Sequence, residues 1–165
     1  MDSQVQIDTK TSELVSRVNY NIPMYAFEEK SWAAGDTIGS EQISACTFVA
    51  IYDQDQFIAA HIPPGQLQPQ EVDESPLIAW YLNKFTSALR QHPLSGMKGG
   101  YFFHRTSLPE KDQRAIKNMF SAHGIVPKVK PYTYQPGSRG YGVVVSRTRE
   151  ELTFNPDIRE SLMRV

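Results

Sequence analysis

Cysteine is the scarcest residue in this chain, with a single copy, Cys46, among 165 residues. One cysteine excludes an internal disulfide, so the disulfide scaffold of small secreted domains does not apply. A free thiol or a metal ligand remains, and the cytoplasm is the natural setting for either. We therefore expect a cytoplasmic location, in the protein's own cell or, for an injected effector, in a host cell.

The chain also lacks a long apolar run and an excess of charge. No stretch approaches the roughly 18 to 20 apolar residues of a membrane helix, and the N-terminal residues lack the apolar centre of a secretory signal. Seventeen basic residues against eighteen acidic ones give a formal net charge of -1, which provides no general attraction to nucleic acid or anionic membrane. We expect no nucleic-acid partner and no membrane insertion, and the sequence leaves the oligomeric state open.

The residues that are present suffice for one folded domain. With 40% apolar and 21% charged residues in 165 positions, the chain is long enough for one domain with a real core and short for two. Residues 1–19 are polar and predict a flexible N-terminal arm. Residues 20–165 are then a single domain.

Hydrophobic patterning predicts strands interspersed with helices. Apolar runs rich in β-branched and aromatic residues predict strands at 43–52, 56–62, 97–105, 125–134 and 141–147. Apolar residues at steps of three and four predict helices at 75–91, 108–123 and 157–163. The first two strands form a hairpin, Ser75 caps the first helix, and Gly99 and Gly100 permit close approach of another segment. The order predicts an α/β (α+β) fold, a mixed β-sheet or sandwich flanked by two helices, with exposed loops at 63–76 and 135–140.

Cys46 and His61 are the candidate reactive residues. A thiol at its ordinary pKa of about 8.5 is only slightly ionised near pH 7, so a nucleophilic cysteine needs a basic partner. The predicted hairpin places Cys46 and His61 on adjacent strands at similar distances from the turn, which brings them together. An activated thiol of lowered pKa, partly exposed in a cleft, is the expectation.

The same residues also have structural interpretations. Cys46 within an apolar run is equally typical of a small buried side chain, and His61 between Ala60 and Ile62 is more often a hydrogen-bonded core histidine. A zinc site is a further alternative, with His104 or His123 as the third ligand. His123 before Gly124 also fits a helix C-terminus.

Several short motifs occur in an order that resembles the CheD chemotaxis receptor deamidases. They include the Ser-Ala-Cys turn at 44–46 followed by AIYD, the Ala60-His61 strand end, GMKGGYFF at 96–103 and GSRGYGVVV at 137–145. More loosely, the chain is similar to the catalytic domains of cytotoxic necrotising factor and of the lethal-factor glutamine deamidases. The resemblance implies a CheD-like catalytic domain over residues 20–165.

This resemblance implies a protein-glutamine deamidase, a cysteine-dependent hydrolase that converts a glutamine of a protein substrate to glutamate. Its nucleophile would be Cys46, its base His61, and the residue that orients the histidine Ser40, where the family usually has threonine. The family commonly has serine or glycine where this chain has Ala45. Such chemistry needs no metal and no organic cofactor. A non-catalytic binding module of the same fold stays an alternative because of these two departures.

Overall fold

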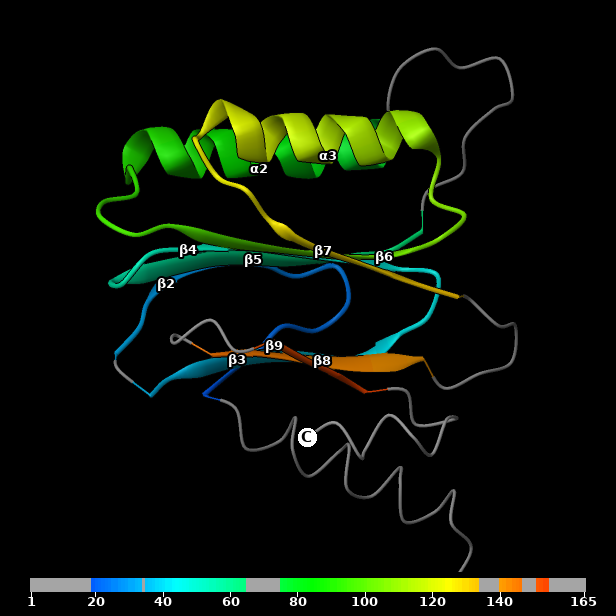
Figure 1. Cartoon of the computed structure of the whole chain (residues 1–165), viewed down its shortest axis with the longest axis horizontal. Helices are drawn as coiled ribbons and strands as arrows, with labels where there is room; N and C mark the ends of the chain where they lie inside the picture. Colours follow the sequence, from blue (N-terminus) through cyan, green and yellow to red (C-terminus); the bar gives the residue numbers. More distant parts are fainter. Residues whose placement is uncertain (1–18, 34, 65–74, 134–139, 147–150, 155–165) are drawn as a thin grey trace, which may run out of the picture.

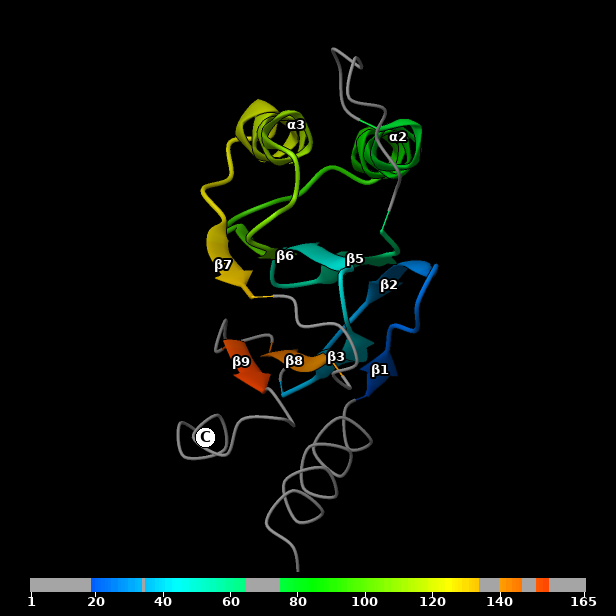
Figure 2. The ribbon, with the colours of Figure 1, turned by 90° about the vertical axis from the view of Figure 1, so that its right-hand side faces the viewer.

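The protein consists of three layers. The computed structural model describes residues 19–33, 35–64, 75–133, 140–146 and 151–154. Within these ranges a pair of helices covers one face of a five-stranded sheet, and a four-stranded sheet covers the other face (Figure 1). Turned by 90°, the helices α2 (Pro76–Gln91) and α3 (Glu110–Ala122) lie side by side over the larger sheet (Figure 2). The mixed α+β class predicted from the sequence is confirmed, with the strands divided between two sheets.

The five-stranded sheet is the central layer. Its order is β2 (Phe27–Ser31), β5 (Gln56–Ile62), β4 (Thr47–Tyr52), β6 (Gly99–Arg105) and β7 (Lys128–Tyr132). All its neighbouring strands are antiparallel except β6 and β7, which are parallel. The β4–β5 pair is the predicted hairpin.

The four-stranded sheet is the outer layer. Its order is β1 (Tyr20–Asn21), β3 (Thr37–Ile43), β8 (Tyr141–Ser146) and β9 (Glu151–Phe154). β1 and β3 are parallel, and the other pairs are antiparallel. Each sheet therefore mixes both strand directions.

Strand β4 is buried on both faces because it lies at the centre of the three layers. Its side chains alternate: Val49 and Ile51 pack toward the helices, whereas Phe48, Ala50 and Tyr52 pack toward the four-stranded sheet. This burial explains a continuous apolar run in place of an alternating one. The protein thus has one core between helices and sheet and a second between the two sheets.

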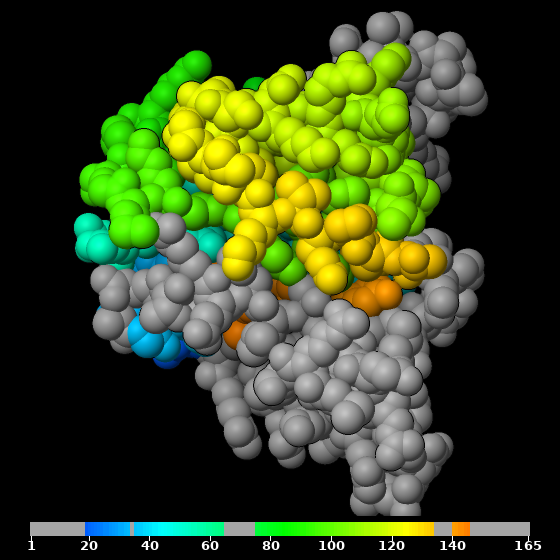
Figure 3. Space-filling model, in the orientation of Figure 1, coloured from blue at the N-terminus to red at the C-terminus, as the bar shows by residue number. Residues whose placement is uncertain are grey.

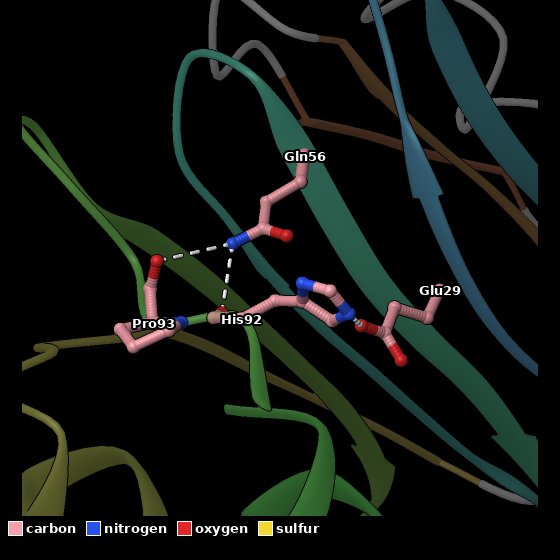
Figure 4. Close-up of polar contacts among 4 residues, drawn as sticks. All are labelled: Glu29, Gln56, His92 and Pro93. Atoms are coloured by element: carbon pink, nitrogen blue, oxygen red, sulfur yellow. Dashed lines mark hydrogen bonds and ion pairs between the residues drawn. The ribbon is translucent and has the colours of Figure 1, made fainter. Parts of the chain in front are cut away.

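Helix α2 begins as predicted and is fixed to the sheet where it ends. The Ser75 hydroxyl accepts a hydrogen bond from the Ile78 amide at 3.3 Å, and a proline follows the cap, an arrangement typical of helix starts. Past the last turn, Gln56 Nε2 on β5 donates to the His92 carbonyl at 2.9 Å and more weakly to that of Pro93 (Figure 4). The His92 ring lies 3.7 Å from the Glu29 carboxylate on β2.

Helix α3 and strand β7 form much of one side of the molecule (Figure 3). The helix ends at Ala122, and after the C-cap His123 comes Gly124, whose φ of +70° is the left-handed conformation that glycine adopts without strain. The predicted strand that follows is shorter than expected, because only Lys128–Tyr132 pairs with β6.

One predicted strand is wrong. The run 43–52 is divided: Ile43 ends β3 in the outer sheet, and β4 begins at Thr47 in the central sheet. Strands β1, β2 and β9 had not been predicted, nor had β3 apart from its last residue, Ile43. Most of the predicted arm (1–18), the middle of the loop (65–74), most of the turn (135–139) and the predicted helix at 157–163 lie outside the described residues. Neither helix in the described ranges is long and apolar enough to cross a membrane.

Candidate functional site

Cys46 lies where the chain crosses from one sheet to the other. The β3–β8 pairing is irregular between Ser40 and Ile43, and Gln42 and Ala45 have φ of 58° and 64°. Such angles cost roughly 1 kcal/mol or more in a residue other than glycine. The chain accepts this strain in the crossing that ends at Cys46.

Gly140 allows the crossing to be tightly packed. Its own φ is +83°, and a Cβ there would lie 2.8 Å from the Ile43 carbonyl carbon and oxygen. A larger residue would collide with backbone, which cannot move aside as a flexible side chain can. The glycine that precedes β8 therefore supports the turn that carries the cysteine.

Cys46 and His61 lie on the same face of the central sheet. His61 pairs with Phe48, which packs between the sheets, and Cys46 belongs to the same cluster. Because side chains alternate along a strand, Cys46 and His61 are diagonal neighbours on this face. Both residues have 0% exposed surface.

Ser40 joins His61 from the opposite sheet. The Ser40 hydroxyl donates to the Ile22 carbonyl at 2.5 Å, and its oxygen lies 2.8 Å from His61 Nδ1. Since the single hydroxyl proton is used by Ile22, the oxygen accepts from an Nδ1–H group. The neutral tautomer with its proton on Nδ1 follows, and Nε2 carries the free electron pair.

The free nitrogen of His61 is buried without a partner. Solvent does not reach Nε2, and no protein group forms a hydrogen bond with it. Burial chiefly lowers the pKa of His61 to about 4, opposed in part by a hydrogen bond with the Ile22 carbonyl. The imidazole is therefore neutral at pH 7, as a general base must be before it accepts a proton.

The expected lowering of the Cys46 pKa is wrong for the free protein, as is the expected partial exposure. Burial raises the pKa of the thiol, opposed by a backbone hydrogen bond at Ser44 and by the positive charge of Arg105. The thiol donates to the Ser44 carbonyl at 3.5 Å and makes no hydrogen bond with Nε2. The two diagonal neighbours are thus a neutral thiol and a neutral imidazole, not an ion pair.

Stability is expected to fall below pH 6.5 because of His61. Its pKa is about 4 in the folded protein and ordinarily 6.5, so between these values the unfolded chain binds a proton that the folded chain does not. The free energy of unfolding therefore keeps its full value above pH 6.5 and falls by about 3 kcal/mol in total as the pH is lowered toward 4. Urea unfolding at several pH values measures it.

In this experiment His61→Gln should reduce the slope of the unfolding free energy against pH. Burial also lowers the pKa of His104, which adds a slope of the same sign, so the difference between wild type and variant is the decisive quantity. The matched control is Asn83→Gln, at an exposed position of α2 that carries no ionisable group, and it should keep the wild-type slope. An unchanged slope in His61→Gln would contradict the burial of a neutral imidazole.

The predicted alternative zinc ligands lie elsewhere. His104 contacts Phe102, which packs toward the helices, so His104 lies on the opposite face of the sheet from His61. His123 is the C-cap of α3. No group of three or more potential metal ligands occurs in the part of the chain that the structure describes.

Two site residues had not been predicted, Arg105 and Tyr132. They are the last residues of the paired strands β6 and β7, at the end of the sheet where Cys46 precedes β4. Tyr132 donates its hydroxyl to the Cys46 carbonyl at 2.6 Å. Only the strand register brings these residues together, and no local sequence signal indicates it.

Comparison with known proteins adds no assignment. No protein-family model matches the chain, and no curated protein matches it.

Proposed function

We propose that this protein is a CheD-like protein-glutamine deamidase. The single observation that carries the proposal is the Ser40–His61 pair: a hydroxyl from one sheet holds Nδ1, which leaves Nε2 buried and unpartnered on the face that bears Cys46. These are the three residues to which the resemblance gives roles. Two sheets packed face to face, with two helices on the outer face of one, also agree with the coarse fold that the resemblance implies.

The proposed reaction begins with proton transfer from Cys46 Sγ to His61 Nε2. The thiolate adds to the amide carbon of the glutamine, and backbone N–H groups near Ala45–Thr47 stabilise the oxyanion. The imidazolium returns its proton to the departing ammonia. Water activated by the same imidazole then hydrolyses the thioester, which leaves glutamate and regenerates the thiol.

The resting geometry defines what the substrate must change. The thiol is hydrogen-bonded to the Ser44 carbonyl and not to Nε2, so the sulfur has to turn toward the imidazole before it reacts. Catalytic hydrogen bonds are often long in free enzymes and shorten when substrate binds. Because Cys46 is buried, the target glutamine must also open a path to it.

The substrate class is a protein with an accessible glutamine, in the protein's own cytoplasm or in a host cell. Residues on loops at the rim of a rigid sheet usually determine such recognition. The predicted exposed loops 63–76 and 135–140 are our candidates for this role, and they lie mostly outside the described residues.

A non-catalytic binding module is the second candidate function. The observation that favours it is the state of Cys46, which is fully buried and whose pKa is raised by burial. A structural thiol has these properties.

Comparison of wild type with Cys46→Ala distinguishes the two candidates. Each protein is incubated with a cell lysate, and mass spectrometry of the digested proteome detects conversion of glutamine to glutamate. A deamidase converts specific glutamines with the wild type and none with Cys46→Ala, because no other residue replaces the thiolate. Equal patterns from both proteins would exclude the deamidase and leave the binding module.

A further inference from the structure

Arg105 is a half-buried cation at the same end of the central sheet as Cys46. Strand β6 pairs with β4 through Phe48 and Phe103, and this antiparallel register, continued by two residues, places Arg105 opposite Cys46. Phe103 packs between the two sheets. Arg105, two residues later, projects to the same side as Phe103, Cys46 and His61.

The guanidinium is not neutralised within the described residues. Its Nε is buried and makes no hydrogen bond, and no carboxylate forms an ion pair with Arg105 in the described ranges. A buried donor without an acceptor is unfavourable, and more so when the group is charged. The fold thus retains an unfavourable cation beside the only cysteine.

We propose that Arg105 stabilises the thiolate form of Cys46. When the Sγ proton moves to His61 Nε2, the negative charge left on sulfur is next to the positive charge of Arg105. The sulfur cannot be stabilised by solvent, because the residue is buried. A nearby cation in a medium of low polarity is the physical replacement for that solvation.

Burial and Arg105 oppose each other at the thiol. Burial raises the pKa of Cys46 more than the charge of Arg105 lowers it, so the free protein keeps a protonated, inert sulfur. Arg105 limits that rise and keeps the thiolate within reach of the weak base His61. It is a positioning residue that acts through Cys46. The inference rests on the proposed function only in taking Cys46 as the nucleophile.

The single cysteine permits a direct test. Protein labelled with ¹³C at the cysteine Cβ gives one resonance, whose shift with pH follows ionisation of Cys46. In Arg105→Gln the titration midpoint should move to higher pH, a loss of roughly tenfold in thiolate at any pH below it. Arg105→Lys should restore most of the thiolate, because the charge returns. The matched control Arg114→Gln, on the exposed side of α3, should titrate as the wild type does.

A second readout and a second variant make the test decisive. The rate of alkylation by iodoacetamide at fixed pH should also fall, since the thiolate is the reacting form. The fall should be smaller than the loss of thiolate, because a thiol of higher pKa is the stronger nucleophile and the reagent reaches the buried residue only when the site opens. Arg105→Met, which keeps the aliphatic stem, replaces Arg105→Gln should the latter lose its native amide spectrum. A midpoint and alkylation rate equal to those of the wild type in a folded neutral variant would overturn the proposal. A shifted midpoint without glutamine conversion by the wild type would reject the deamidase and leave the role of Arg105 in place.

Discussion

His61→Ala is expected to reduce the rate of glutamine conversion by about 10²–10⁴-fold, the usual contribution of a positioned acid–base group. The variant loses His61 Nε2, the unpartnered nitrogen proposed to accept the proton of Cys46, so the thiol loses that acceptor. The initial rate on a glutamine identified by mass spectrometry measures the effect. The fold should persist, because Ile22 still accepts the Ser40 hydroxyl.

Ser40 variants provide the graded comparison. Ser40→Ala removes the acceptor of Nδ1–H, so the imidazole samples unproductive orientations and the rate should fall by less than in His61→Ala. Ser40→Thr keeps the hydroxyl and restricts its rotamers, so it should retain the rate. Full activity in His61→Ala would show that another group is the base. Full activity in Ser40→Ala alone would transfer the orienting role to the Ile22 carbonyl.

Gly100→Ala is expected to destabilise the protein by about 1–3 kcal/mol, the usual cost of overpacking a core. The new Cβ would lie 2.5 Å from Phe120 Cε1 and 3.0 Å from Ile125 Cγ2. Phe120 is fully buried between helix and sheet, so its ring has little room to move. Thermal or urea unfolding of the variant measures the loss.

A double-mutant cycle with Phe120→Leu identifies the source of that loss. Trimming the ring removes the atoms that the new Cβ would meet, so the double variant should be more stable than the sum of the two single effects predicts. Strict additivity would show that the ring is not the obstacle. The destabilisation would then come from the backbone of β6.

Local patterns predicted the elements that depend on local signals. Helix α2 was predicted with its cap because Ser75, a proline and an apolar stripe are encoded in consecutive residues. The strand at 43–52 was wrong because its apolar run continues through the turn at 44–46, and apolar residues are buried equally well in either sheet. Charged β2 and two-residue β1 lack the patterns of core strands, so they gave no signal.

For the candidate site, too, the sequence predicted only what depends on local patterns. The hairpin between β4 and β5 predicted that Cys46 and His61 share a region, because the turn between them is short. Ser40 came only from the resemblance, and its bond to His61 spans two sheets. Gly99 and Gly100 indicated a close approach, but the approaching groups are the rings of Tyr52 and Phe120, which the sequence alone did not indicate. The raised pKa of the thiol arises from its surroundings, which a linear pattern does not contain.

The Ser40–His61 hydrogen bond is also a mechanical link between layers. Because its two ends belong to β3 and β5 in different sheets, a small slide of one sheet over the other would stretch this bond while each sheet kept its internal pairing. Catalytic competence would then be lost at a lower energy than the fold itself. The resonance of the Nδ1 proton would therefore respond to the spacing between the two sheets. Followed under hydrostatic pressure, it would report whether Ser40 still holds the imidazole in place.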